Sequence, residues 1–410
     1  MLNCFELFRK ILQWVNFESE LYRFPFSRHI NVLFFLGVWA FDSDDRMVTH
    51  AYGSYRLVTF LILVSCVICQ GIDFWMALGN LEKMTYNMCT SVVTLLTTIK
   101  LLIILQRSDS LRNMRKMLMR DYYGYSSPQD EIIKRHALDE MNFLAKTYLG
   151  ALSVFLPVCM LIGFFSYLWG PRELPFPSFF PINYDIPSQY NIAFLIEVYC
   201  GALIITSAIL LDLVVFGVVI QIAAQYRILH KDILTLNEFY SKQNEVNILL
   251  KRDETVQYLK KIISRQKNLM RYVKKFEWCF NELIFIHIFG GTILIIVNGL
   301  QVLKMSYTIN HKLMYEIVYL VLLIVDMYYN CHYMNILTLQ CKSLGDAAYS
   351  IDWYEMDAGL QKYLLMVIMQ AQRPPRITAG KLFVVDLNTF LSLMKNTYSW
   401  LMLFRQIEMK

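Results

Sequence analysis

Seven apolar segments, each long enough to cross a lipid bilayer, constrain this chain more than any other feature. A transmembrane helix needs about 20 mostly apolar residues. Hydrophobic residues make up 56% of the chain and charged residues 18%, with a mean hydropathy of +0.38. This composition excludes an ordinary soluble protein and predicts an all-α membrane protein with seven transmembrane helices. The apolar runs lie at residues 55–78, 84–105, 141–169, 193–220, 277–303, 315–341 and 381–404.

Lysine and arginine are divided unevenly between the loops on the two sides of the membrane. The N-terminal stretch and the loops after the second, fourth and sixth spans hold 29 of them, whereas the opposite side holds six. Because cytoplasmic loops carry the excess of basic residues, the N-terminus is predicted to be cytoplasmic and the C-terminus extracellular. This orientation is the reverse of that of G-protein-coupled receptors. The net charge of +6 reflects basic loops beside anionic membrane lipid and does not indicate nucleic acid binding.

Two charged segments between the spans have apolar residues at helical spacing. They are predicted to form a cytoplasmic helical anchor domain for subunit assembly, with no resemblance to an enzyme site and no metal or cofactor spacing. Trp353, Tyr354 and Leu364 lie on the apolar face of the second segment. The chain then divides into a cytoplasmic and re-entrant segment 1–54, spans one to four in 55–220, helical extensions in 221–276, spans five and six in 277–341, an anchor helix in 342–380 and the final span in 381–410.

The final span carries a polar stripe that leads into aliphatic residues. Its members are spaced by three or four residues, so they share one face of a helix. A polar face that ends in an apolar ring is what the wall of a gated aqueous pore requires, because a hydrophobic constriction closes by losing its water. A buried helix–helix seam also collects serine and asparagine, and periodicity alone favours the seam. The stripe consists of Asn388, Ser392, Asn396, Ser399, Leu403, Gln406 and Ile407.

The predicted outer halves of spans two, three, four and six are rich in aromatic and small hydroxyl side chains. A mostly apolar cavity with a few hydrogen-bonding groups would suit a small volatile ligand. An aromatic belt at the membrane interface would have a similar composition, and the residues alone leave both interpretations open. The external loop 172–191 interleaves four prolines with aromatic residues, a composition that suits a folded lid better than a flexible tether.

Three C-terminal segments carry a family likeness. SLGDAAYSIDWYEM, VIMQAQRPPRITAGKLF and NTFLSLMKNTYSWLMLFRQ closely resemble the C-terminal signature of insect odorant receptors, as do the FLGVW run and the LPFPSFFP loop. The resemblance implies a tetrameric, odorant-gated, non-selective cation channel in which the last helix of each subunit lines the pore. It therefore favours the pore over the seam, with the gate at Leu403, Gln406 and Ile407.

The resemblance also implies the positions of the ligand and the partner. Segment 221–276 is shorter than in the coreceptor of this family, so the chain resembles an odorant-tuning subunit that forms a heterotetramer with the coreceptor. No obligate G protein is implied, and the expected location is the plasma membrane of an olfactory neuron dendrite. The implied pocket residues are Asn87, Thr90, Ser91, Gly163, Tyr167, Phe194, Val198, Tyr315, Val318 and Tyr319.

Two other classes remain as alternatives. A gustatory-receptor-type channel would share the topology and the pore, but its terminal signature places Tyr and Gln closer together than Tyr398 and Gln406. A metabotropic seven-helix receptor would require an external N-terminus, which the distribution of basic residues opposes.

Overall fold

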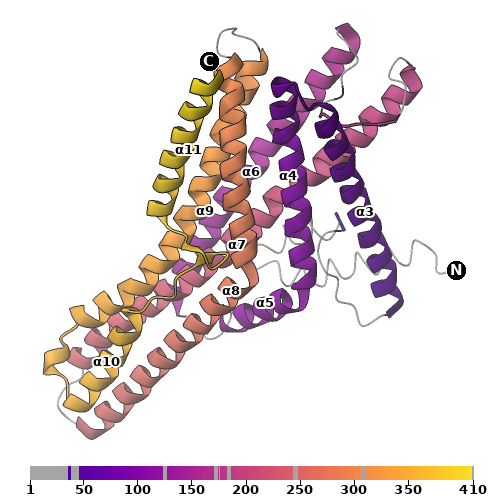
Figure 1. Ribbon diagram of the computed structural model, residues 1–410. Helices are drawn as coiled ribbons and strands as arrows, with labels where there is room; N and C mark the ends of the chain where they lie inside the picture. Colours follow the sequence, from indigo (N-terminus) through magenta and orange to yellow (C-terminus); the bar gives the residue numbers. More distant parts are fainter. Residues whose placement is uncertain are drawn as a thin grey trace.

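The computed structural model describes residues 36–37, 46–122, 127–169, 174, 176–181, 186–242, 248–305 and 311–408. The predicted re-entrant segment lies almost entirely outside these residues. The described chain is a bundle of long helices (Figure 1). The helices are α3 Arg46–Met76, α4 Leu81–Gln106, α5 Ser108–Tyr122, α6 Pro128–Trp169, α7 Pro187–Lys242, α8 Ile248–Met305, α9 His311–Ser350, η2 Trp353–Glu355, α10 Ala358–Ala371 and α11 Leu387–Glu408.

The seven predicted spans correspond to α3, α4, α6, α7, α8, α9 and α11. Among the described residues, α3, α4, α7, α8 and α9 are long and apolar enough to cross a membrane by composition alone. In α6 the side chains of the last turns are outside the described set. The polar stripe of α11 lowers its mean hydropathy, because Asn, Ser and Lys interrupt the apolar run. A helix of this composition needs polar or aqueous surroundings on one side.

Two helices extend far beyond the thickness of a bilayer. Helix α7 has 56 residues and α8 has 58, whereas about 20 residues cross the roughly 30 Å hydrocarbon core. Their extra turns run into a compact end of the molecule where α10 packs on α8 and α9, at the lower left of Figure 1. Helix α7 is the central element, with an almost continuous buried run from Leu210 to Leu229 that packs on α6, α8 and α9.

Ion pairs join the helices at this end. Lys231 of α7 pairs with Asp130 of α6, and Arg265 of α8 lies 2.9 Å from Asp232 of α7. Although burial raises the pKa of the Asp130 carboxyl, hydrogen bonds from Lys231 and Ser127 lower it below the usual value. The Asp130 carboxylate is therefore held in its charged form. Each charged side chain of these ion pairs faces a partner of opposite charge on a neighbouring helix rather than apolar side chains.

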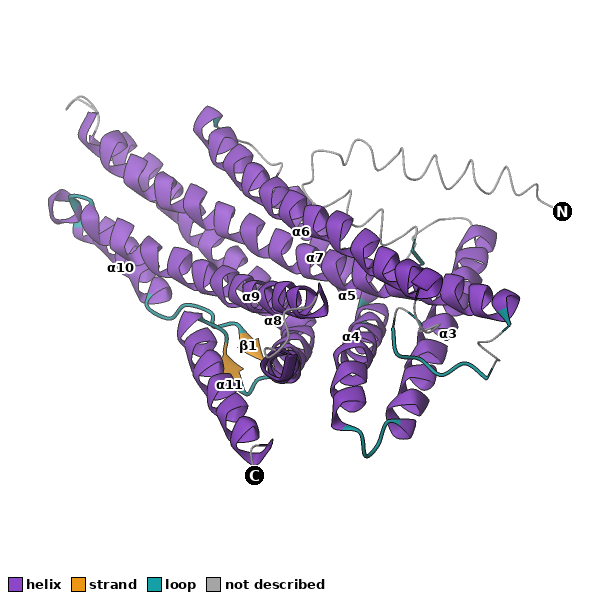
Figure 2. Cartoon of the chain, turned by 90° about the horizontal axis from the view of Figure 1, so that it is seen from above, coloured by secondary structure: helices purple, strands orange, loops and turns teal. Residues whose placement is uncertain are grey.

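The view from above separates the two flanks of the bundle (Figure 2). Helix α11 lies on one flank and α3 with α4 on the other, while α8 and α9 stand between them. Helix α11 packs on α8 and α9. The two middle helices therefore form a shared wall between the α3–α4 flank and the last helix.

A two-stranded hairpin precedes α11, where the sequence predicted the start of the final span. Strands β1 Thr378–Ala379 and β2 Phe383–Val384 pair antiparallel. Gly380 and Lys381 have φ of 57° and 61°, and the Gly380 N–H donates to the Asn281 carbonyl of α8 at 3.0 Å. Left-handed residues cannot continue a right-handed helix, so the predicted start at residue 381 was wrong. Helix α11 begins at Leu387, after Asp386 accepts a hydrogen bond from the Thr389 N–H at 2.8 Å.

Candidate ligand cavity and pore-facing helix

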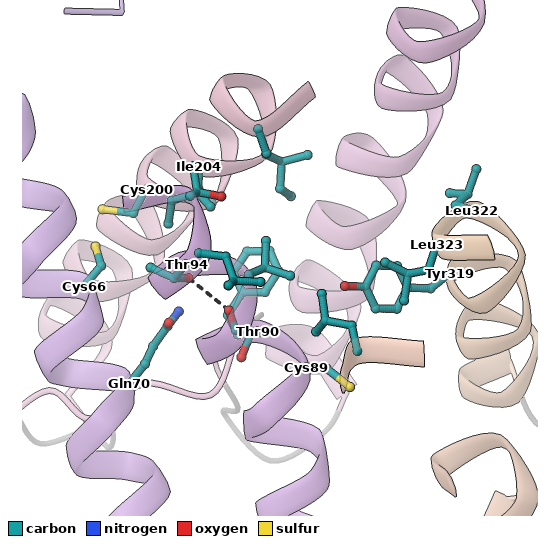
Figure 3. Close-up of a pocket in the computed structure, with 18 of the residues that line it drawn as sticks. Cys66, Gln70, Cys89, Thr90, Thr94, Cys200, Ile204, Tyr319, Leu322 and Leu323 are labelled. Carbon is teal, nitrogen blue, oxygen red and sulfur yellow. Dashed lines mark hydrogen bonds between the residues drawn. The ribbon is translucent and has the colours of Figure 1, made fainter. Parts of the chain in front are cut away.

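A cavity of about 1450 Å³ lies between α3, α4, α6, α7, α8 and α9. Figure 3 shows part of its wall. Apolar and sulfur-containing side chains alternate with a few polar groups, and the Tyr319 ring points from α9 towards α4. Such a volume and lining suit a small organic molecule. The labelled wall residues are Cys66, Gln70, Cys89, Thr90, Thr94, Cys200, Ile204, Tyr319, Leu322 and Leu323.

The external loop closes one end of the cavity. Phe176 and Ser178 line it, and the Phe176 N–H donates to Oε2 of Glu197 on α7 at 3.3 Å. The Phe176 ring lies against Gly201, where an added Cβ would be 2.5 Å from Cε2 of the ring. A second backbone bond joins the Phe179 N–H to the Cys69 carbonyl of α3 at 3.2 Å. The loop is thus fastened to both α3 and α7 as a lid.

A charged network closes the other end. Lys100 Nζ lies 3.0 Å from Asp212 Oδ1 and 2.7 Å from His287 Nδ1. His287 Nε2 is 3.0 Å from Asp326 Oδ2, and the Tyr148 hydroxyl donates to Asp326 Oδ1 at 2.8 Å. These side chains come from α4, α7, α8, α9 and α6. Because charges inside a membrane are costly, mutual pairing is what allows them there.

The same network offers possible metal ligands. Asp212, His287 and Asp326 present ligand atoms within 4.8 Å of one another. The Lys100 ammonium group, however, already contacts both Asp212 and His287. The Lys100 ammonium therefore already occupies the position between Asp212 and His287, where it would compete with a metal ion.

Three of the sequence-predicted ligand residues line the cavity: Thr90, Tyr315 and Tyr319. Asn87 and Ser91 do not belong to the cavity wall formed by the described residues. Asn87 is fully buried and donates from Nδ2 to Asp73 Oδ2 at 2.7 Å, while the Ser91 hydroxyl donates to Asn87 Oδ1 at 2.5 Å. Their prediction as ligand contacts needs correction, because Asn87 fastens α4 to α3 and Ser91 holds the Asn87 side chain from within α4.

Other predicted ligand residues also lie elsewhere. Val318 is 51% exposed, and Phe194 stacks on Tyr190 with ring centroids 6.2 Å apart. Neither these two nor Val198 belong to the cavity wall formed by the described residues. Gly163 and Tyr167 lie on α6, but their side chains are outside the described set. The sequence did not single out Gln70, Cys200 or Leu322 as wall residues, because they belong to ordinary apolar runs.

Helix α11 presents its polar stripe outward. Asn388, Ser392, Asn396 and Ser399 are exposed, as are Leu403 and Gln406 at its far end. The opposite side packs on α8, where an added Cβ at Gly299 would be 3.0 Å from the Leu401 side chain. The side chain of Ile407 is outside the described set. The stripe is therefore not a seam within one subunit, and it is available to an aqueous pore or to another subunit.

The predicted anchor residues differ in accessibility. Tyr354 is 65% exposed, whereas Leu364 is 2% exposed and packs inside the subunit. Trp353 lies between Tyr349 and Tyr354, with ring centroids 6.2 and 6.1 Å away. Leu364 cannot reach a second subunit because its own helix bundle covers it, and this part of the prediction was wrong. The exposed apolar side chains beside it are Leu365, Met366 and Met369.

Comparison with known proteins gives the family. The sequence model described as 7tm Odorant receptor matches residues 80–398, well over half of the chain. This chain belongs to the odorant receptor family. The receptor is 22% identical to odorant receptor 10 of Aedes albopictus over 370 residues, which cover 87% of the receptor and 93% of that relative.

The similarity to a coreceptor is only partial. The receptor is 25% identical to the odorant receptor coreceptor of Aedes albopictus over 176 residues, 42% of the receptor and 36% of the coreceptor. Its match to odorant receptor 10, by contrast, runs through nearly the whole of both chains. The receptor is therefore of the odorant-tuning type rather than a coreceptor, as the sequence predicted.

Solved structures confirm the fold. The receptor superimposes on the insect olfactory receptor OR5 from Machilis hrabei with a TM-score of 0.80 at 12% identity, covering 93% of the receptor and 97% of that chain. The complex of the same olfactory receptor with eugenol gives a TM-score of 0.79 at 14% identity. The all-α fold with seven transmembrane helices is thus confirmed.

Proposed function

We propose that the receptor is the odorant-binding subunit of a heteromeric, ligand-gated, non-selective cation channel. A small volatile ligand occupies the cavity between α3, α4, α6, α7, α8 and α9, and α11 lines the pore. The partner is the odorant receptor coreceptor, and the complex resides in the plasma membrane of an olfactory neuron dendrite. The eugenol complex of the Machilis hrabei receptor supports a volatile ligand, and the partial coreceptor similarity supports the partner.

One observation carries this proposal: helix α9 both lines the cavity and packs against α11. Tyr329 of α9 lines the cavity, and the neighbouring Tyr328 meets Phe390 of α11 edge-on, with ring centroids 5.7 Å apart. Helix α8 contributes a second link through Gly299 and Leu401. Because helices are stiff, a shift of α9 caused by the ligand would be transmitted to α11 through these packed contacts.

The gate is proposed at Leu403, Gln406 and Ile407. Aliphatic side chains around a narrow axis exclude water and so exclude ions. A ligand that packs against Tyr315 and Tyr319 would favour the position of α9 in which Leu403 and Ile407 leave the axis. The ligand opens the gate only to the extent that it binds the open state more tightly than the closed state.

Subunit assembly is proposed to involve the compact end formed by α10 and the ends of α8 and α9. Tyr349 and Tyr354 are 68% and 65% exposed there, beside Leu365 and Met369, which are more than half exposed. A cluster of exposed apolar and aromatic side chains is the usual composition of a protein interface. Gln266 stiffens this surface from within, since its Nε2 donates to the Val367 carbonyl of α10 at 3.2 Å.

The test is electrical recording from cells that express the receptor with and without the coreceptor. A panel of volatile compounds should evoke rapid cation currents only with both subunits, and G-protein blockade should not alter them. Tyr319→Ala should shift the concentration required for half-maximal current, whereas Val321→Ala, an exposed position of the same helix, should not. Currents that vanish under G-protein blockade would favour a metabotropic receptor instead.

A further inference from the structure

Two buried oxygen atoms of the cavity have no hydrogen-bond partner among the described residues. They are Oε1 of Gln70 on α3 and Oε1 of Glu197 on α7, and none of the described residues donates to either. Both side chains line the cavity and are only 6% and 4% exposed. Figure 3 places the end of Gln70 on the cavity side of α3, towards Thr94 and opposite Tyr319. A buried acceptor without a donor costs free energy, most of all in a membrane.

The Ser178 hydroxyl of the lid is hydrogen-bonded to the Glu197 carboxyl but leaves Oε1 without a partner, and the hydroxyl groups of the two nearby threonines do not supply the missing donors either. The Thr90 hydroxyl donates to the Asn87 carbonyl at 3.0 Å, and the Thr94 hydroxyl donates to the Thr90 carbonyl at 3.0 Å. The hydroxyl hydrogens of these threonines are therefore already donated to backbone carbonyls of α4. What the α3–α7 side of the cavity offers to a ligand is a pair of acceptors.

We propose that the cavity selects small apolar ligands that carry a hydroxyl or amino group as a hydrogen-bond donor. A hydroxyl, which has one hydrogen, donates to Glu197 Oε1 or to Gln70 Oε1, whereas an amino group has hydrogens for both; the carbon skeleton packs towards Tyr319, Leu322 and Leu323 on the opposite wall. The inference rests on the proposed function, because it assigns a chemical class to the ligand of that cavity. Ethers, esters and ketones without a donor would leave both acceptors unsatisfied and are disfavoured.

The same carboxyl group links the ligand to the lid. Glu197 Oε2 accepts a hydrogen bond from the Phe176 N–H at 3.3 Å. A ligand donor bound at Oε1 therefore fixes the orientation of the same carboxyl group that holds the lid. The Phe176 ring on Gly201 then covers the donor from outside. Ligands of the proposed class should therefore stabilise the closed lid as well as fill the cavity.

The experiment uses three compounds with one carbon skeleton: a primary alcohol, the corresponding primary amine and the methyl ether of the alcohol. Each is tested at several chain lengths on the receptor–coreceptor complex. Binding is measured as ligand-dependent thermal stabilisation of the purified complex, and gating as evoked current. Loss of one hydrogen bond corresponds to about a tenfold difference in affinity, so the alcohol and the amine should act at about tenfold lower concentrations than the ether.

Two variants test the acceptors separately. Gln70→Met keeps the side-chain length, removes one acceptor and leaves the bond between Glu197 and Phe176 intact, so it should reduce the advantage of both donors over the ether. Glu197→Gln keeps a carbonyl acceptor but removes the carboxyl group, so it should weaken the amine more than the alcohol. Leu322→Val on the opposite wall is the control. It should weaken all three compounds alike.

The two readouts separate this inference from the channel assignment. Donor-selective stabilisation without current from any compound would support the inference and contradict the proposed function. Equal potency of alcohol and ether, a preference for the ether, or no stabilisation by any of the compounds would overturn the inference. An unchanged donor advantage in both Gln70→Met and Glu197→Gln would also overturn it, because the acceptors would then lie elsewhere.

Discussion

Lys100 of α4 and Asp212 of α7 form an ion pair of 3.0 Å at the inner end of the cavity, with side chains only 6% and 13% exposed. His287 and Asp326 extend this pair to α8 and α9. Because the network joins α4, α7, α8 and α9 where they line the cavity, it fixes their relative positions. The charges are largely shielded from water there, and their mutual pairing lowers the cost of placing them inside the bundle.

Removing one partner of this pair should destabilise the receptor strongly. Lys100→Met leaves Asp212 and Asp326 with only His287 as a counter-charge, and breaking a buried pair typically costs about 3–5 kcal/mol. We expect low surface expression and a lower melting temperature for Lys100→Met and for Asp212→Asn. The double variant should recover part of the loss, and Lys260→Met at an exposed position should change little. Normal stability of both single variants would contradict a structural role of the pair.

The position of the lid depends on the absence of a side chain at residue 201. A Cβ at Gly201 would be 2.5 Å from the Phe176 ring, a separation at which one of the two must move. Gly201→Ala should displace the lid and raise the ligand concentration needed for half-maximal current by about tenfold or more, which corresponds to roughly 1.4 kcal/mol of binding free energy. Gly150→Ala is the matched control, because nothing lies within 4 Å of its Cβ position. Equal ligand sensitivity of both variants would show that the lid does not cover the site.

The aliphatic end of the α11 stripe should control the closed state. Leu403 is 45% exposed in the isolated subunit, and Leu403→Ala would widen the proposed constriction and lower the barrier to its hydration. We expect a current in the absence of ligand, measured as the fraction of total current present before ligand is applied. Leu391→Ala, on the same helix but beside the stripe, should remain closed. A Leu403→Ala channel that is as tightly closed as the wild type would place the gate elsewhere.

A lysine lies beside the proposed conduction path. Lys395 is exposed, and its backbone carbonyl accepts the Ser399 hydroxyl at 3.0 Å. A positive charge near the pore repels permeant cations, so Lys395→Gln should increase the single-channel conductance, and Lys395→Glu should increase it further. High salt should reduce the difference because it screens the charge. Identical conductances would mean that Lys395 faces away from the ions.

Much of this architecture is predictable from the sequence because bilayer thickness imposes a length on every span. Seven apolar runs of that length indicate seven helices, and the spacing of Asn388, Ser392 and Asn396 identifies one face of the last helix. The hairpin before α11 is not predictable in this way. Residues 382–385 are apolar and continue the span by composition, while the turn depends on the left-handed backbone at Gly380 and its contact with α8.

The cavity wall is harder to predict, because it is formed by side chains that meet from distant parts of the chain. Periodicity places Asn87 on an inward face of α4, but it does not reveal that Asp73 and Ser91 use its hydrogen-bonding groups. Charged residues inside spans are a usable signal. It applies to Glu197 and Asp212, which lie within predicted spans, but it does not give their neighbours, since Lys100 and His287 lie more than 70 residues from Asp212 in the sequence.

The most direct test of the central claim is ligand-dependent chemical modification of α11. Ser392→Cys places a thiol on the stripe, and Leu391→Cys places one beside it. With the coreceptor present and the channel opened by ligand, a charged thiol reagent should block the current of Ser392→Cys quickly and that of Leu391→Cys slowly or not at all. Block of neither variant, or of both at the same rate, would contradict a pore lined by the polar face of α11.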